Sequence, residues 1–184
     1  IAAVRDHAIA SEEMANLRTA IKAAIGGDLP DARAARDKIG DPAARKLVDW
    51  VIYRGGYGSA NEVRTFLEAN PAWPDRRLLI QRSEEALFNG TASAAEVKAF
   101  FGDREPATAI GLAALASACQ ADKEEARAKA LAVKAWTENH VPAGLEAAFL
   151  KRVGPMLGAA DHKRRLDRLL FNDSRWSGER KERA

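Results

Sequence analysis

Two short stretches decide the fold: "SANEVRTFL" at residues 59–67 and "SAAEVKAFF" at residues 93–101. Each opens with Ser-x-x-Glu, the capping box in which a serine hydroxyl and a glutamate carboxylate satisfy the free amides at a helix start. Each continues with a valine and, three residues later, a phenylalanine, which forms an apolar stripe on one helix face. Both stretches therefore predict the first turns of amphipathic helices.

The surroundings of the two stretches repeat as well. Each is followed by a proline-containing link and a longer helical pattern, at 75–88 and 106–121, and the two units begin 34 residues apart. A weaker echo at 145–152 precedes a further helical pattern at 161–171. Helix pairs with this period are typical of tetratricopeptide-like α-solenoids, in which each pair buries its apolar face against its neighbours. A compact helical bundle is the alternative.

The rest of the chain agrees with an all-helical fold. Alanine dominates the apolar residues, which make up 47% of the chain, and alanine favours helices over strands. Asp41-Pro42 predicts a helix start, and 11–27 and 28–40 read as an antiparallel pair, each closed by glycine. We expect about ten helices in one α-solenoid domain over 1–175, part of a larger superhelix, with 176–184 as a basic polar tail or the start of a linker.

Charge argues against a nucleic-acid partner. The net charge is +3, and residues 161–184 hold eight Lys/Arg against five acids, so the basic excess lies in this one segment. Nucleic-acid binders usually contact more phosphates than such a surplus can neutralise. A helical repeat that binds nucleic acid stays the weakest alternative. No apolar stretch approaches the length of about 20 residues that spans a bilayer.

The sequence offers no catalytic or cofactor motif. Its three histidines are scattered, the single cysteine, Cys119, lies in a small-residue run, and the glycines at 55–58 follow a helix rather than a strand. Metal sites and phosphate-binding loops need tighter patterns. We therefore expect no metal, no cofactor and no catalytic residue, and read Cys119 as a buried small side chain.

The stretch "DHKRRLDRLLF" at 161–171 resembles an active site in composition but reads better as an amphipathic helix. At about 100° per residue, Leu166, Leu169, Leu170 and His162 share one face, which we expect to point inward. Arg164 and Arg168 then point outward, and Asp161–Arg165 and Lys163–Asp167 are spaced for ion pairs along the helix.

Four stretches together resemble one family. "AARKLVDWVIYR" (43–54), "FLEANPAWPDRRLLIQRSEEAL" (66–87), "FLKRVGPML" (149–157) and "DHKRRLDRLLF" (161–171) are similar, in order and spacing, to the amino-terminal superhelical region of soluble lytic murein transglycosylases. The run Asn70-Pro71-Ala72-Trp73-Pro74 with its following arginines is the most specific. The family often has an aromatic residue at Lys163 and Trp at Phe171, so the match is a diverged one.

The resemblance implies a periplasmic protein of the bacterial cell wall. Such enzymes cleave the β-1,4 bond between N-acetylmuramic acid and N-acetylglucosamine in peptidoglycan and release 1,6-anhydromuropeptides. Their catalytic glutamate, followed by serine, lies in a carboxyl-terminal lysozyme-like domain, and no Glu-Ser pair occurs in this chain. The chain would then be an inactive superhelical part whose partners are the glycan strands and the missing domain. A free-standing adaptor that binds a protein in its groove is the alternative.

Binding residues can be nominated only by side-chain type. Trp73 and Trp176 are candidates for stacking on sugar rings, and Arg76, Arg164 and Arg168 are candidates for glycan or interface contacts. Tryptophan in a helical array more often serves packing, so the two tryptophans carry that competing interpretation.

Overall fold

A computed structural model describes residues 9–171, and within them the chain forms ten α-helices, one 3-10 turn and no strand. The all-α prediction is confirmed. The elements are α1 (Ser11–Gly26), α2 (Leu29–Asp37), α3 (Pro42–Arg54), α4 (Ala60–Ala69), α5 (Arg76–Asn89), α6 (Ala94–Phe101), α7 (Ala109–Ala121), α8 (Glu125–Glu138), α9 (Ala143–Val153), η1 (Gly154–Met156) and α10 (Ala159–Phe171).

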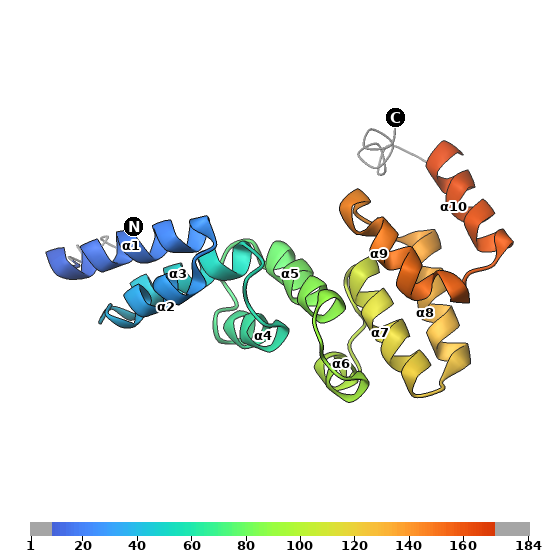
Figure 1. Cartoon of the computed structure of the whole chain (residues 1–184), viewed down its shortest axis with the longest axis horizontal. Helices are drawn as coiled ribbons and strands as arrows, with labels where there is room; N and C mark the ends of the chain where they lie inside the picture. The colour runs from blue at the N-terminus through green and yellow to red at the C-terminus, as the bar shows by residue number, and fades with distance from the viewer. Residues whose placement is uncertain (1–8, 172–184) are drawn as a thin grey trace.

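The helices follow one another along an elongated array (Figure 1). The predicted pairs α1–α2, α4–α5 and α6–α7 pack together. Beyond them, α1 contacts α3, α3 contacts α5, α5 contacts α7 and α7 contacts α9, so alternate helices form a continuous row. The weaker echo at 145–152 predicts that α9 pairs with α10, but α10 packs mainly against α8.

Both capping boxes form as the sequence predicts. The Ser59 hydroxyl accepts from the Glu62 amide at 3.2 Å, and the Glu62 carboxylate accepts from the Ser59 amide at 2.8 Å. In the next repeat the corresponding bonds between Ser93 and Glu96 measure 3.3 and 2.7 Å. Asp41 caps α3 through the Ala44 amide at 2.7 Å. The local signals therefore start these helices where expected.

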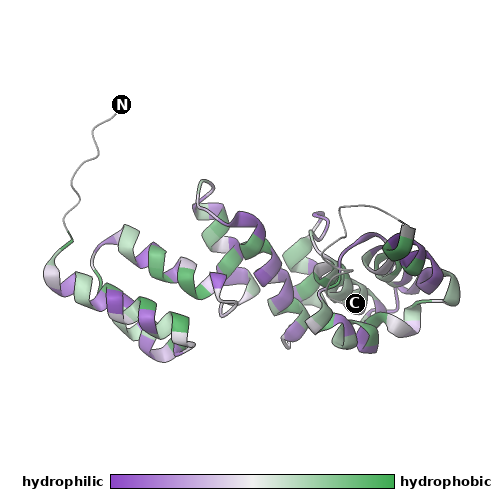
Figure 2. Ribbon diagram, turned by 90° about the horizontal axis from the view of Figure 1, so that it is seen from above, coloured by the Kyte–Doolittle hydropathy of each residue, from purple (hydrophilic) through white to green (hydrophobic). Residues whose placement is uncertain are grey.

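The hydrophobic core divides into three clusters along the array. One joins α1, α2 and α3, a smaller one joins α4 and α5, and the largest gathers side chains from α4 to α9. Most helices carry both hydrophobic and hydrophilic residues (Figure 2), as expected for elements with one buried face.

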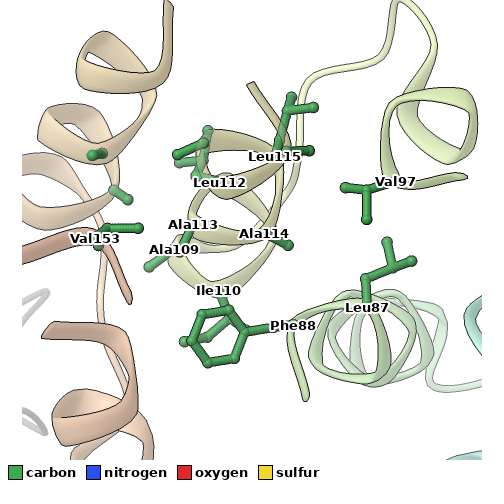
Figure 3. Packing of buried hydrophobic residues seen from close by; sticks show 14 of the residues in the cluster. Leu87, Phe88, Val97, Ala109, Ile110, Leu112, Ala113, Ala114, Leu115 and Val153 are labelled. Carbon is green, nitrogen blue, oxygen red and sulfur yellow. The ribbon is translucent and has the colours of Figure 1, made fainter. Parts of the chain in front are cut away.

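Helix α7 is the exception, because nearly all its residues are buried. Figure 3 shows Leu87 and Phe88 of α5, Val97 of α6 and Val153 of α9 around it. Its small side chains let neighbouring helices approach from several sides, and Cys119 lies fully buried among them as predicted. Burial is the main reason that the pKa of the Cys119 thiol is raised, which keeps it in the unreactive protonated form.

Candidate binding pocket

A pocket of about 210 Å³ lies where α4, α5 and α6 meet the link before α7. Its wall combines apolar side chains with three arginines and three glutamates. The lining residues are Arg64, Leu67, Glu68, Arg76, Ile80, Ser83, Glu84, Phe100, Phe101, Arg104, Glu105 and Ala107.

Two of the arginines meet on one backbone oxygen. Arg64 Nη1 donates to the Phe100 carbonyl at 3.2 Å, and Arg104 Nη2 donates to the same oxygen at 2.6 Å. Both guanidiniums also lie near the Phe100 ring, with their central carbons 5.0 and 5.8 Å from its centroid. The partial negative charge at the end of α6 and the ring face attract these cations, and Arg64 also has the Glu68 carboxylate within ion-pair distance.

The third arginine enters from the start of α5. Arg76 Nη1 donates to the Leu67 carbonyl near the end of α4 at 2.9 Å. Within residues 9–171, neither Arg76 nor Arg104 has a carboxylate within ion-pair distance. A guanidinium carries more N–H donors than these backbone bonds use, so both side chains retain capacity for an anionic partner.

The glutamates of the pocket are differently engaged. Glu84 is 3% exposed and accepts from the Ala107 and Thr108 amides at 2.7 and 2.9 Å and from the Thr108 hydroxyl. These bonds lower the pKa of the Glu84 carboxyl, but burial has the larger effect, so the pKa is raised. Glu105 forms an ion pair with Lys134, and Glu68 approaches Arg64 Nε at 3.9 Å with its side chain 65% exposed. Three guanidiniums and three carboxylates line the wall, and within residues 9–171 Arg76 and Arg104 are the two of its guanidiniums that have no carboxylate partner.

The lining has binding groups but no catalytic set. Ser83, the one hydroxyl among the lining residues, donates to the Ile80 carbonyl at 2.7 Å, and no histidine or cysteine lies in the pocket wall. A nucleophile with an adjacent base, the usual arrangement for covalent catalysis, is not found there. The arrangement suits recognition of a small anionic and partly apolar group.

The predicted contact residues do not form one site. Arg76 lines this pocket. Trp73, nearby, is half-buried and meets the Phe66 ring edge-on at 5.7 Å, which favours the packing interpretation over an open sugar platform. Arg164 is exposed on α10, at the carboxyl-terminal end of the array and away from α4 and α5 (Figure 1). Trp176 lies outside the described residues.

Helix α10 faces its neighbours differently from the sequence prediction. Arg165, not the leucines, is buried, and Leu166 and Leu170 are 53% and 57% exposed. The expected inward position of His162 is also wrong, because it is exposed and touches the Trp136 ring only edge-on at 5.6 Å. The Lys163–Asp167 ion pair is confirmed at 2.7 Å.

The reason for this rotation is the ring of Trp136. The Arg165 guanidinium lies 3.9 Å from its centroid, donates to the Trp136 carbonyl at 3.1 Å and pairs with Glu146 at 3.3 Å. Arg168, predicted to point outward, is partly buried and donates to the Asn139 carbonyl at 3.0 Å. Cation–π contact and charge-assisted bonds draw the arginines toward α8.

Composition alone did not nominate Arg64, Arg104 or Glu84. A signal for Glu84 exists in the sequence, since it follows Ile80 by four residues and precedes Leu87 and Phe88 by three and four. It thus lies on the buried face of its own helix. The two arginines carry no such signal, because they come together only in the folded chain, where both donate to the Phe100 carbonyl.

Comparison with known proteins found no match to a protein-family model. Curated proteins and solved structures likewise yielded no similar chain. In the described residues, no group of three or more His, Cys, Asp or Glu is placed to hold a metal ion. Across 9–171, none of the helices has the length and apolarity needed to cross a membrane.

Proposed function

We propose that this chain is the non-catalytic helical scaffold of a periplasmic lytic murein transglycosylase, and that it holds peptidoglycan near a separate catalytic domain. The observation that carries the proposal is the row of stacked helices from α1 to α9, which presents an extended surface rather than an enclosed active site. The ordered resemblance at 43–54, 66–87, 149–157 and 161–171 supports the same family. The pocket around Arg76 adds a place for ligand contact.

A helical protein-interaction adaptor is the second candidate. The exposed side chains of Leu166 and Leu170, one turn apart on α10, favour it, because a contiguous exposed apolar surface is a feature of protein-interaction sites. The same stacked helices would serve either role.

Cosedimentation with purified cell-wall sacculi tests the proposal. We expect the chain to be retained on sacculi but not on chitin, and to release no 1,6-anhydromuropeptides when the soluble fraction is analysed by mass spectrometry. Failure to bind sacculi, together with capture of a defined protein partner that Leu166→Ser weakens, would favour the adaptor. Clear release of anhydromuropeptides would contradict the non-catalytic assignment.

A further inference from the structure

The pocket formed by α4, α5, α6 and the link before α7 holds two arginines, Arg76 and Arg104, that have no carboxylate partner within residues 9–171. Arg64 and Arg104 share the Phe100 carbonyl, and Arg76 enters the same space from the start of α5. Guanidiniums that line one pocket repel one another, and an anion bound there lowers that repulsion. The three glutamates of the wall already have partners: Glu84 accepts from the Ala107–Thr108 segment, Glu105 pairs with Lys134, and Glu68 lies 3.9 Å from Arg64.

The remainder of the wall limits what the anion can be. Leu67, Ile80, Phe100 and Phe101 supply apolar surface, so an apolar group must lie beside the charge. The pocket volume of about 210 Å³ is roughly seven times the 30 Å³ that one water takes in the liquid. This space accommodates a small group rather than a polymer segment.

A singly charged carboxylate suits this pocket better than a phosphate does. A guanidinium offers paired N–H groups that fit the oxygens of either anion, so the charge of the ligand decides between them. The buried Glu84 carboxylate, which lines the same pocket, repels a ligand with a larger negative charge. From these features we infer that the pocket binds the free terminal carboxylate of a short peptide whose last side chain is small and apolar.

In such a complex, Arg76 and Arg104 bind the carboxylate, and the last side chain packs on Leu67 and Ile80. Arg64 remains on Phe100, where it adds positive charge without having to move. The inference goes beyond the proposed scaffold role, since it names a ligand for one pocket and does not require cell-wall binding by the whole array.

Two soluble peptides test the inference and distinguish two possible sources of the terminal carboxylate, a cell-wall stem peptide and a protein. N-acetyl-D-alanyl-D-alanine represents the end of a cell-wall stem peptide, and N-acetyl-L-alanyl-L-leucine represents the end of a protein. Titration calorimetry with the full chain should detect binding of at least one free acid, and the matching carboxamide should bind at least tenfold more weakly. Absence of binding by both acids, or equal binding of acid and amide, would overturn the inference.

Variants locate the binding. Arg76→Gln and Arg104→Gln should each lower the affinity for the free acid at least tenfold. Arg77→Gln, at the exposed neighbouring position, should leave that affinity within twofold of the unaltered chain. If a variant does not fold, backbone amide shifts of the unaltered chain give the second measurement: the acid should perturb 64–68 and 100–107 and not 42–54. Perturbation elsewhere alone would contradict the site. Sacculi retention measures the scaffold role separately, so the two can fail independently.

Discussion

Glu84 shows how a residue that looks like surface charge in the sequence can organise a core. Its carboxylate accepts hydrogen bonds from the Ala107 and Thr108 amides, just before α7, and from the Thr108 hydroxyl. The Thr108 hydroxyl in turn accepts from the Gly111 amide at 3.0 Å and caps the helix. An acceptor at a helix start satisfies amides that have no partner within the helix. Helix α5 thereby fixes where α7 begins.

Gly111→Ala should destabilise the chain although alanine favours a helix. A Cβ at Gly111 would overlap the Glu84 carboxylate, which is held by three bonds and cannot move away freely. The helix-propensity gain of about 1 kcal/mol should be outweighed by an overpacking cost of about 1–3 kcal/mol and by loss of the Glu84 bonds.

Urea denaturation measures the effect on the free energy of unfolding. Gly144→Ala is the matched control, because Gly144 lies in a helix and no atom is near its added Cβ. It should be neutral or stabilising. Equal behaviour of the two variants would mean that Glu84 does not restrict Gly111.

Glu84 should also make stability depend on pH. Burial raises its pKa above the ordinary value of 4.5, so the folded chain holds this proton more tightly than the unfolded chain does. The contribution of Glu84 to the free energy of unfolding should therefore be greatest below pH 4.5 and fall as pH rises through the raised pKa. Thermal melts of Glu84→Gln between pH 4 and 8 should lack this fall. A parallel pH profile for both chains would contradict the assignment.

Arg165 is the corresponding residue on α10. It is 2% exposed, lies over Trp136 and pairs with Glu146. Arg165→Ala should lower the free energy of unfolding by about 1.5–3 kcal/mol, because the Trp136 carbonyl and the partly exposed Glu146 carboxylate lose a charged hydrogen-bond partner. Arg164→Ala, at the exposed neighbour, should stay within about 0.5 kcal/mol. Chemical denaturation of both variants measures these free energies. Similar losses for the two variants would contradict the buried position of Arg165 and favour the orientation of α10 expected from its leucines.

At the scale of elements, the capping boxes tie sequence to structure most directly. Ser93→Ala removes an acceptor for the Glu96 amide and a partner of its carboxylate, so we expect a loss of about 1 kcal/mol in urea denaturation. Ser11→Ala is the control, because Ser11 follows the Ala10 cap and makes no capping bond. A loss of stability in Ser11→Ala as large as that in Ser93→Ala would show that the capping box does not contribute to the free energy of unfolding.

The start of a helix could be predicted from the sequence where it depends on residues close together in the chain. The buried face of a helix could be predicted where one apolar stripe dominates. Ser59, Ser93 and Asp41 mark helix starts through bonds that span three residues, so the chain itself carries the information. The inward face of α10 could not be predicted, since it depends on the ring of Trp136, which lies 29 residues before Arg165. The pocket escaped prediction for the same reason: its arginines meet through tertiary packing.

The repeat also carries side chains that link one unit to the next. Arg64 and Lys98 occupy equivalent positions 34 residues apart. Arg64 reaches the Phe100 carbonyl of the following unit, and Lys98 reaches Asp122 and Glu124 in the turn after α7. The two contacts differ in chemistry, but each joins a unit to the chain that follows it, as expected where neighbouring repeats stack on one another.

For the whole molecule, the three core clusters predict that stability is distributed along the array. Val48 is fully buried in the cluster of α1, α2 and α3, and Phe149 is fully buried in the cluster that includes α7 and α8. Because the most extensive contacts join helices one or two places apart in the chain order, loss of one cluster need not open the others.

Hydrogen exchange followed by mass spectrometry can resolve this along the chain. Val48→Ala should speed exchange across 11–54 while 109–138 keeps its protection, and Phe149→Ala should do the reverse. A buried truncation of this size costs about 2–5 kcal/mol, enough to reveal local opening where the helix row is weakest. Uniform loss of protection in both variants would instead mean that the three clusters unfold as one cooperative unit, joined through α5, which contributes Leu79 to the cluster with α4 and Phe88 to the largest cluster.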